Sequence, residues 1–143
     1  MVIFVVGAKG VGKTRWLINN ANKDMKEGNG NIAFVDVDDD HIFSLDYNVR
    51  LINAMEYGIT DSDMFYGFIC GMLAMDYDLE KIYVDSIYKI LNFSTESLVY
   101  LFEKLQAISD QANTKIYINM EGALDQLPEG IRENAVEITG DEE

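Results

Sequence analysis

The hydrophobic residues of this chain alternate between two kinds of segment. The first kind is a short, nearly continuous apolar run, as expected for a strand buried on both faces of a sheet. Five such runs predict strands at residues 2–6, 31–36, 81–85, 115–119 and 136–139. The polar loop after the second run also contains a short piece, residues 49–52, that fits an extended conformation.

The second kind of segment repeats apolar residues at helical spacing. Three segments show this pattern: one from Lys13 to a glycine-containing turn at 27–30, one over 61–77, and one from about Thr95. Thr60 and Asp63 resemble a capping box at the start of the second helix. Strands that alternate with helices predict a mainly parallel, five-stranded sheet covered by helices on both faces. We therefore expect a single α/β domain over residues 1–143, folded as a three-layer α/β/α sandwich.

A glycine-rich motif lies between the first predicted strand and the first predicted helix. Residues 7–14 read Gly-Ala-Lys-Gly-Val-Gly-Lys-Thr, which is the complete P-loop pattern G-x-x-x-x-G-K-[ST]. Gly7 and Gly12 allow the backbone to wrap closely around an anion. Lys13 is expected to bridge the β- and γ-phosphates, and Thr14 to place its hydroxyl on Mg²⁺. The motif predicts binding of a nucleoside triphosphate.

The remaining loop residues complete this expected phosphate site. The backbone N–H groups of Gly10 and Val11 belong to the expected phosphate cradle, and the following helix presents its positive end to it. Lys9 adds positive potential near the phosphates. Arg15 lies one turn into the helix, facing either the nucleotide or solvent. Chromosome-partitioning ATPases carry a second lysine at the loop's second position, where this chain has Ala8.

Composition restricts the partners of such a site. The chain has 25 acidic and 11 basic side chains, a formal net charge of −14, so nucleic acid and anionic membranes are disfavoured. A single cysteine, Cys70, cannot form an intramolecular disulfide and suits a reducing cytoplasm. The longest apolar stretches are too short for a signal peptide or a membrane span. We expect a cytoplasmic protein without membrane insertion.

The motif and the strand after residue 80 resemble the P-loop NTPase superfamily. In that superfamily the aspartate that holds Mg²⁺ through a water generally ends the third strand. Ile82-Tyr83-Val84-Asp85 matches this Walker B form, so the resemblance assigns the metal to Asp85 together with Thr14. Asp36, which ends the second predicted strand, is the rival metal ligand.

The division of the superfamily that includes RecA-like ATPases often follows this aspartate with a catalytic glutamate. Here the next residue is Ser86, which implies slow unaided hydrolysis. In that division a polar residue ending the fourth strand senses the γ-phosphate; Asn119 matches, and Glu121 is a candidate displaced base. Kinases and GTPases instead place the magnesium strand beside the P-loop strand, and the sequence leaves both divisions open.

Two other readings of the motif have less support. GTPases read guanine with N/T-K-x-D after a late strand, and no such motif is present there. Small-molecule kinases gather several arginines around the transferred phosphoryl group, whereas this chain has three in all. Of these, Arg132 before the last strand is the candidate arginine finger. A phosphotransferase remains an alternative.

An acidic segment follows the second predicted strand. Residues 36–41 open like a calcium-binding loop, D-x-D-x-D, but His41 stands where that loop requires glycine and Tyr47 where it requires glutamate. We therefore expect a solvated acidic turn at the carboxyl edge of the sheet, where ligands bind in such folds and where it could assist Mg²⁺.

Taken whole, the chain resembles small uncharacterised bacterial ATP-binding proteins with a Gly-x-Lys-Gly-x-Gly-Lys-Thr loop. Some of these carry a twitching-motility ATPase label, but those motors have an additional N-terminal domain and histidine-containing boxes that this chain does not match. The resemblance implies ATP and Mg²⁺ as ligands. Two readings remain: a slow ATPase stimulated by a protein partner or by self-association, and a nucleotide-gated binding module that hardly hydrolyses.

Overall fold

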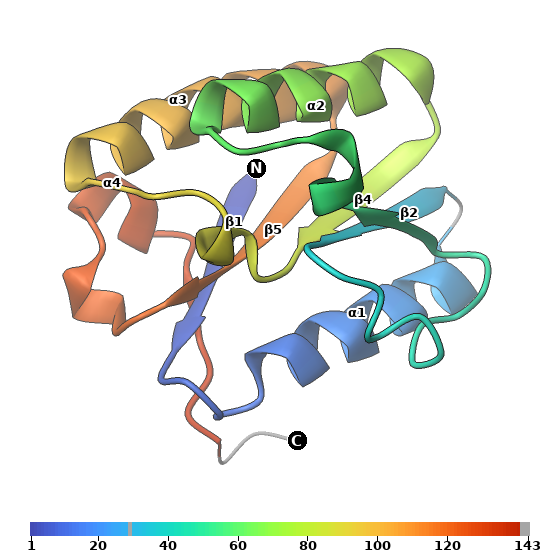
Figure 1. Ribbon diagram of the computed structural model, residues 1–143, viewed down its shortest axis with the longest axis horizontal. Coiled ribbons are helices and arrows are strands. Elements are labelled where there is room, and N and C mark those ends of the chain that lie inside the picture. Colours follow the sequence, from blue (N-terminus) through green and yellow to red (C-terminus); the bar gives the residue numbers. More distant parts are fainter. Residues whose placement is uncertain (29, 141–143) are drawn as a thin grey trace.

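The computed structural model describes residues 1–28 and 30–140, and within them six strands form one sheet (Figure 1). Its strands are β1 (Val2–Gly7), β2 (Asn31–Asp36), β3 (Arg50–Asn53), β4 (Leu79–Val84), β5 (Lys115–Glu121) and β6 (Val136–Glu137). Their order is β3-β2-β4-β5-β1-β6, and every ladder between neighbours is parallel. The predicted α/β class and the mainly parallel sheet are confirmed.

The predicted count of five strands is wrong. The additional strand is β3, which pairs with β2 from Ala33↔Arg50 to Asp36↔Asn53. Its four residues lie at the edge of the sheet and are only partly buried, so they lack the continuous apolar run that marks the central strands. At the opposite edge, β6 is shorter than the predicted 136–139.

Four α-helices and three short 3₁₀ turns connect these strands within the described part of the chain. The helices are α1 (Lys13–Glu27), α2 (Ser62–Met75), α3 (Thr95–Ala112) and α4 (Glu129–Arg132). The 3₁₀ turns are η1 (Ala54–Tyr57), η2 (Ile87–Lys89) and η3 (Leu124–Gln126). The predicted capping box of α2 is wrong: Asp61 is the N-cap, and its carboxylate accepts the Met64 N–H at 2.8 Å. Asn29 of the predicted turn and residues 141–143 lie outside the described residues.

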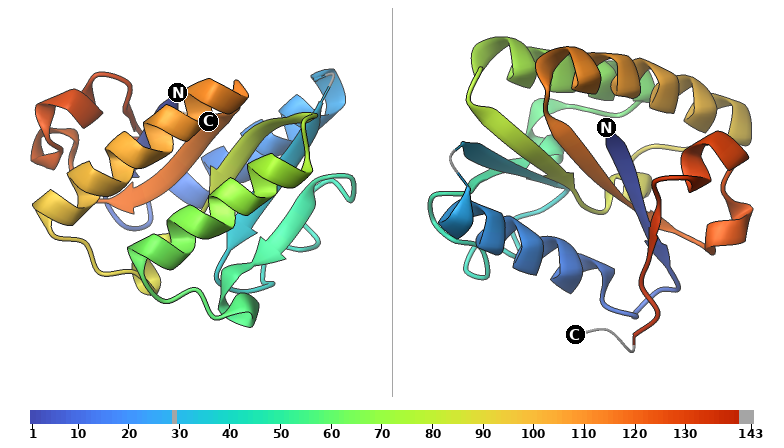
Figure 2. Two further views of the ribbon diagram at one scale, coloured as in Figure 1. Left: turned by 90° about the horizontal axis from the view of Figure 1, so that it is seen from above. Right: turned by 180° about the vertical axis from the view of Figure 1, so that it is seen from behind.

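The helices cover both faces of the sheet. Helix α1 lies on one face, while α2 and α3 run side by side across the other (Figures 1 and 2). Each face has its own apolar cluster. Leu17, Ile18 and Ala21 of α1 pack with Phe34 and Tyr83 on one side. Phe65 and Ile69 of α2 and Leu101 and Leu105 of α3 are buried with Ile116 on the other.

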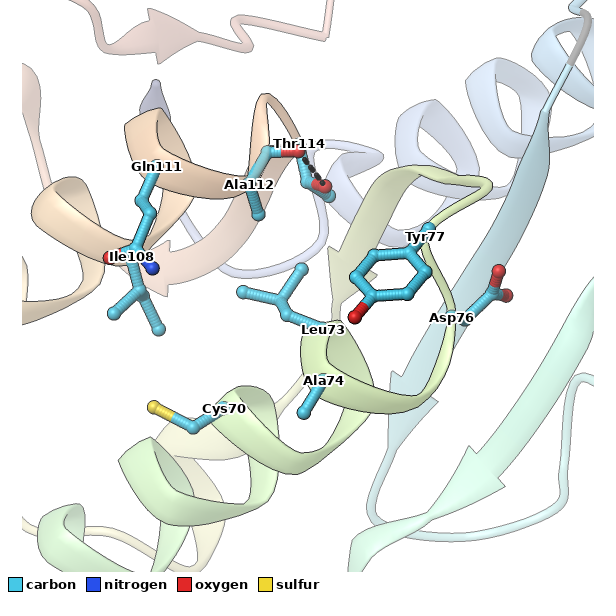
Figure 3. Close-up of a pocket in the computed structure, with 9 residues that line it drawn as sticks. All are labelled: Cys70, Leu73, Ala74, Asp76, Tyr77, Ile108, Gln111, Ala112 and Thr114. Carbon is cyan, nitrogen blue, oxygen red and sulfur yellow. Dashed lines mark hydrogen bonds between the residues drawn. The ribbon is translucent and has the colours of Figure 1, made fainter.

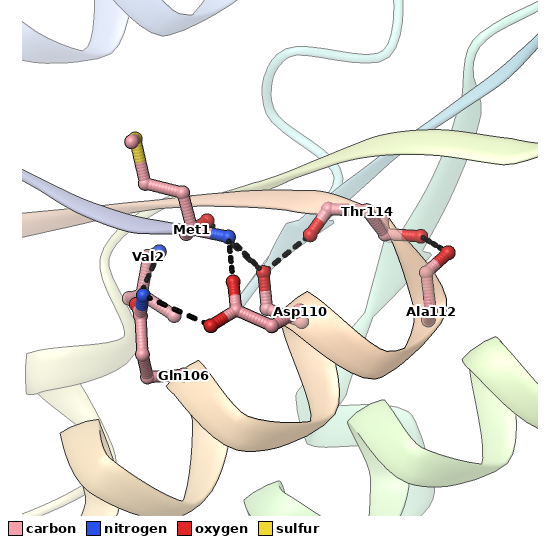
Figure 4. A network of polar contacts seen from close by, with 7 residues as sticks. Met1, Val2, Gln106, Asp110, Ala112 and Thr114 are labelled. Atoms are coloured by element: carbon pink, nitrogen blue, oxygen red, sulfur yellow. Dashed lines mark hydrogen bonds and ion pairs between the residues drawn. The ribbon is translucent and has the colours of Figure 1, made fainter.

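Polar contacts join the helices to the strand ends. At the start of β1, the backbone nitrogen of Met1 lies 2.6 Å from Ser109 Oγ and 3.1 Å from an Asp110 oxygen, both on α3 (Figure 4). The same helix supplies Gln106, whose side-chain oxygen accepts the Val2 N–H at 2.8 Å. These contacts fix the position of β1 along the sheet.

On the other face, Asp24 of α1 binds two side chains of β4. One carboxylate oxygen pairs with Lys81 Nζ at 2.9 Å, and the other accepts the hydroxyl of Tyr83. The Tyr83 ring also stacks on Tyr117 of β5, with ring centroids 4.8 Å apart. Helix α1 is thereby tied to the central strands.

Because the ladders are parallel, the carboxyl ends of the strands share one edge of the sheet. Gly7, Asp36, Asp85 and Glu121 all stand at or directly after a strand end. Among the described residues, no helix combines the length and the apolar character needed to cross a membrane.

Candidate functional site

The glycine-rich loop joins β1 to α1 at this carboxyl edge, and its glycines have definite geometric reasons. A Cβ on Gly7 would lie 2.5 Å from the carbonyl oxygen of Ile138, so a side chain cannot be added without moving the backbone. Gly12 is the N-cap of α1 and has φ 106° and ψ 24°, a left-handed conformation that suits glycine. The loop therefore turns tightly into the helix, whose free N–H groups face the loop.

Lys13 is the first residue of α1, and its side chain folds back over the loop. Its Nζ donates to the carbonyl oxygens of Gly7 at 2.7 Å and Ala8 at 3.0 Å. The residue is only 6% exposed. Burial lowers the pKa of Lys13, and the negative charges of Glu121 and Asp85 oppose that shift. A cationic group thus lies between the loop and two carboxylates.

Thr14, Asp85 and Asn119 meet at the end of the central strands. The Thr14 hydroxyl lies 3.0 and 3.2 Å from the two carboxylate oxygens of Asp85. Asn119 of β5 donates its side-chain N–H to the same carboxylate. Asp85 and Asn119 are each 1% exposed, and Asn119 Oδ1 has no hydrogen-bond partner among the described residues. Three elements distant in sequence supply this cluster.

Asp36 lies beside this cluster at the end of β2. One of its carboxylate oxygens accepts the Val37 N–H at 2.7 Å, while Oδ2 is buried with no partner among the described residues. Burial raises the pKa of Asp36 to about 6; the Val37 hydrogen bond opposes the shift and the charge of Asp85 adds to it. The Asp85 carboxylate therefore receives more hydrogen bonds from the protein than the Asp36 carboxylate does.

A pocket of about 360 Å³ brings most of the predicted site residues together. Its lining includes eight of them: Lys9, Gly10, Gly12, Lys13, Thr14, Arg15, Asp36 and Asn119. Glu121 is exposed at the end of β5, opposite Gly7 in the β1–β5 register. Its charge reaches both Lys13 and the pocket residue Tyr88.

Gly7 and Asp85 do not line this pocket but contact Lys13 and Thr14, which do. Two further predicted residues lie elsewhere. Arg132 is on α4 and does not line the pocket; its guanidinium donates to the Leu127 carbonyl at 2.9 Å. The structure therefore gives its predicted role as an arginine finger no support within this chain. Val11 borders a second groove of about 420 Å³, which runs along α1 past Trp16 and Asn19. Gly12 and Arg15 line both hollows, so the two are adjacent.

The pocket also contains residues that were not among the predicted binding, catalytic or metal-ligating residues, although the acidic turn at 36–41 was expected at this edge of the sheet. They are Asp38, Asp40, His41, Ser86, Tyr88 and Lys89. Ser86 has φ 60°, an unusual conformation for a residue other than glycine and one that is frequent at functional sites. Burial raises the pKa of Tyr88, with the charges of Glu121 and Asp85 adding to the shift. Their position directly after Asp85, the predicted metal ligand, was the available signal for Ser86, Tyr88 and Lys89.

A different pocket lies between the C-terminal parts of α2 and α3 (Figure 3). Its volume is about 490 Å³, and Leu73, Ala74, Tyr77 and Ile108 contribute to its lining. Among the residues that the structure describes, Asp76 is the only charged one in this lining. The paired charged groups that chemistry on an anion or a metal requires are instead concentrated at the glycine-rich loop.

The donor set at the loop suits a hard cation. The Thr14 hydroxyl and the Asp85 carboxylate offer oxygen ligands, which Mg²⁺ prefers, and Lys13 with the start of α1 offers the donors that a phosphate requires. No protein-family model matches the chain, and neither does any curated protein.

Proposed function

We propose that the protein binds MgATP at the glycine-rich loop and hydrolyses it slowly, with a partner completing the catalytic site. The observation that carries this proposal is the contact between Thr14, in the first turn of α1, and Asp85, directly after β4. The P-loop reading requires the threonine and the strand-ending aspartate to share one Mg²⁺ ion. The direct contact of these two residues, 71 positions apart in the sequence, supports that reading.

Lys13 and the start of α1 would hold the phosphates, and Thr14 with Asp85 would hold Mg²⁺, which neutralises charge on the phosphate oxygens when bound. Asn119 orients the Asp85 carboxylate through its N–H, and its Oδ1 has no hydrogen-bond partner among the described residues. Glu121, close enough for its charge to act on Lys13, is the candidate group to accept a proton from water. Lys9 and Arg15 add positive potential at the rim.

The strand order supports the RecA-like division of the P-loop superfamily over the kinase and GTPase division. Strand β5 lies between the loop strand β1 and the Asp85 strand β4. In kinases and GTPases the corresponding two strands are neighbours. The pocket lining supports the same choice, because Arg15 is its only arginine among the described residues and phosphoryl transfer generally uses more.

The groove along α1 supports binding of a whole nucleotide at this position. It adjoins the phosphate pocket at Gly12 and Arg15, and its lining includes Trp16, Asn19 and Asn20. An indole for packing and amides for hydrogen bonding are the groups that a purine base and a ribose require. We propose adenine as the base because the guanine-reading motif is missing from the sequence.

The acidic loop after β2 supports a role for a partner. Asp38, Asp40 and His41 line the pocket, while Phe43 and Tyr47 of the same loop are 97% and 93% exposed. One segment thus faces the candidate nucleotide on one side and presents aromatic side chains outward on the other. If hydrolysis stays negligible even with a partner, the same geometry describes a nucleotide-gated binding module.

The experiment is calorimetric titration of the purified protein with MgATP and MgGTP. We expect ATP to bind more tightly, and Lys13→Ala to weaken it roughly 10- to 100-fold by removing a charge-assisted contact. Lys115→Ala is the matched control. It also deletes a lysine charge, but at the start of β5, at the end of the strand away from the candidate site. Equal ATP affinity in the wild type and a folded Lys13→Ala variant would refute the proposal.

A further inference from the structure

We propose that Asp36, His41 and Asp85 form a second divalent-cation site, which loads without nucleotide and favours cations that accept a nitrogen ligand. One potential ligand atom from each residue lies within 4.8 Å of the other two. This site shares Asp85 with the Mg²⁺ position but differs from it in its other ligands, which come from β2 and the acidic loop instead of from Thr14. It does not depend on the proposed ATP binding.

The buried carboxylate of Asp36 is the independent observation that points to a ligand. The side chain is 2% exposed, and Oδ2 receives no hydrogen bond among the described residues. A buried carboxylate oxygen without a donor is costly, and the nearby Asp85 carboxylate adds repulsion. A divalent cation held by both carboxylates would offset both terms.

The position of His41 suits coordination better than direct pairing. Among the described residues, no ion pair within 4.0 Å joins His41 to Asp36 or Asp85. The ligand atom of His41 is therefore more than 4.0 Å and at most 4.8 Å from those of Asp36 and Asp85. This separation is too wide for a direct hydrogen bond and leaves space for an ion. At that upper limit the centre of the three atoms lies about 2.8 Å from each, so a shift of about 0.6 Å reaches normal metal–ligand distances. His41 lies on a loop without regular helix or strand, which can make such a shift.

The mixed ligand set determines the preferred metals. An imidazole with two carboxylates suits Mn²⁺, Co²⁺ or Zn²⁺, whereas Mg²⁺ and Ca²⁺ favour oxygen ligands alone. The exposed rim of the site carries Asp38 and Asp40, whose charges attract any cation without distinguishing among them. His41 is therefore the residue that confers selectivity.

The test uses Co²⁺ on untagged, nucleotide-free protein. The chain contains a single histidine, so its imidazole resonances identify themselves in an NMR spectrum. We expect one equivalent of Co²⁺ to shift or broaden those resonances and to give a visible absorption band typical of a site with a nitrogen ligand. Calorimetry should show Co²⁺ binding at least 10-fold more tightly than Mg²⁺.

His41→Ala should lower Co²⁺ affinity at least 10-fold and leave Mg²⁺ affinity within about 2-fold, because only the nitrogen ligand is lost. Asp36→Asn should weaken both. Asp39→Asn is the control, since it removes the same charge from an exposed position of the same loop that lies outside the cluster.

Unperturbed histidine resonances at saturating Co²⁺ would overturn the inference even if His41→Ala failed to fold. Equal Co²⁺ affinity in the wild type and His41→Ala would overturn it as well. Lys13→Ala should bind Co²⁺ at least as well as the wild type, because Lys13 is not a ligand and its removal lowers repulsion. A failure of ATP binding is therefore distinguishable from a failure of this site.

Discussion

At the scale of single residues, Asp36 and Asp85 show how two similar carboxylates acquire different properties. Both follow or end a buried strand at the same edge of the sheet. Asp85 accepts hydrogen bonds from Thr14 and Asn119, whereas the Oδ2 atom of Asp36 has no partner in the described part of the chain. Burial consequently raises the pKa of Asp36 to about 6. The fold accepts an unfavourable buried charge at one position of its candidate site.

We predict that Asp36→Asn stabilises the metal-free protein by about 1–2 kcal/mol at pH 7, because it removes a poorly solvated charge. In the wild type, the Asp36 carboxyl binds its proton more tightly in the folded state than in the unfolded state. The contribution of Asp36 to stability therefore falls as the pH rises from 3.8 to about 6, and is constant above that. Urea denaturation in a chelator should show the advantage of Asp36→Asn shrinking toward pH 4.

The exposed Asp39→Asn substitution should change the free energy of unfolding by less than about 0.5 kcal/mol at any of these pH values. An Asp36→Asn variant no more stable than the wild type at pH 7 would show that the carboxylate is better solvated than its contacts indicate.

For the candidate nucleotide site, we predict that Asp85 and not Asp36 couples Mg²⁺ to ATP affinity. Asp85→Asn should abolish the increase in ATP affinity caused by Mg²⁺, because it removes the carboxylate in contact with Thr14. Asp36→Asn should preserve most of that increase. Calorimetry with and without Mg²⁺ on both variants measures the effect, with circular dichroism to confirm folding. The reverse pattern would show that Asp36, at the end of β2, holds the metal in place of Asp85.

At the scale of secondary-structure elements, the loop between β1 and α1 depends on the edge strand β6. The Ile138 N–H binds the Val6 carbonyl at 2.8 Å, and the Ile138 carbonyl oxygen occupies the space where a Gly7 side chain would lie. Strand β6 contains only two residues, so this contact contributes much of its attachment. The start of the glycine-rich loop and the end of the sheet are therefore mutually constrained.

Gly7→Ala and Gly10→Ala test this constraint as a matched pair. Both glycines have positive φ, but nothing lies within 4 Å of a Cβ built on Gly10. Gly10→Ala should cost about 1–2 kcal/mol through backbone strain alone. Gly7→Ala should cost about 1–3 kcal/mol more, because it displaces Ile138. Urea denaturation without nucleotide measures both costs, and equal values would mean that β6 moves aside freely.

The central elements were predictable because each has a strong local signal. The apolar runs ending at Val6, Val35 and Val84 fixed the buried strands, and the glycine-rich motif fixed the start of α1. Strand β3 was not counted because its four residues are stabilised by pairing with β2 and not by burial of an apolar run. Asp61 is the cap in place of the predicted Thr60 because side-chain geometry, which spacing does not determine, selects among neighbouring residues that can cap a helix.

The candidate site was predictable only where a motif defined it. The meeting of Thr14 with Asp85 followed from the superfamily pattern, and Asn119 followed from its strand end. His41 was considered only as a departure from a calcium-loop pattern, because its approach to Asp36 and Asp85 depends on an irregular loop. Arg132 was placed at the site on sequence position alone, and the orientation of α4 directs it to Leu127 instead.

At the scale of the whole molecule, we predict slow hydrolysis of ATP by the isolated protein, below about 1 s⁻¹. Ser86 stands where a catalytic glutamate is often found, and Arg132 is engaged outside the pocket. An arginine supplied by a partner can accelerate such reactions by about 10³- to 10⁵-fold. Phosphate release at saturating MgATP measures the rate, with Lys13→Ala to identify contaminating activity. A faster Lys13-dependent rate would indicate that Glu121 already serves as an effective base.

The strand order has a consequence for how the molecule is made. Strand β1 is synthesised first, yet its two neighbours begin only at Lys115 and Val136, whereas β2, β3 and β4 pair among themselves within residues 31–84. A chain emerging from the ribosome can assemble that second half-sheet while the apolar run Val2–Val6 still has no strand beside it. A nascent chain that stops before Lys115 contains the whole glycine-rich motif but lacks the strand that holds it in place. If the loop binds ATP as proposed, that capacity should appear late and abruptly during translation, and chaperones should contact residues 2–6 until β5 has emerged.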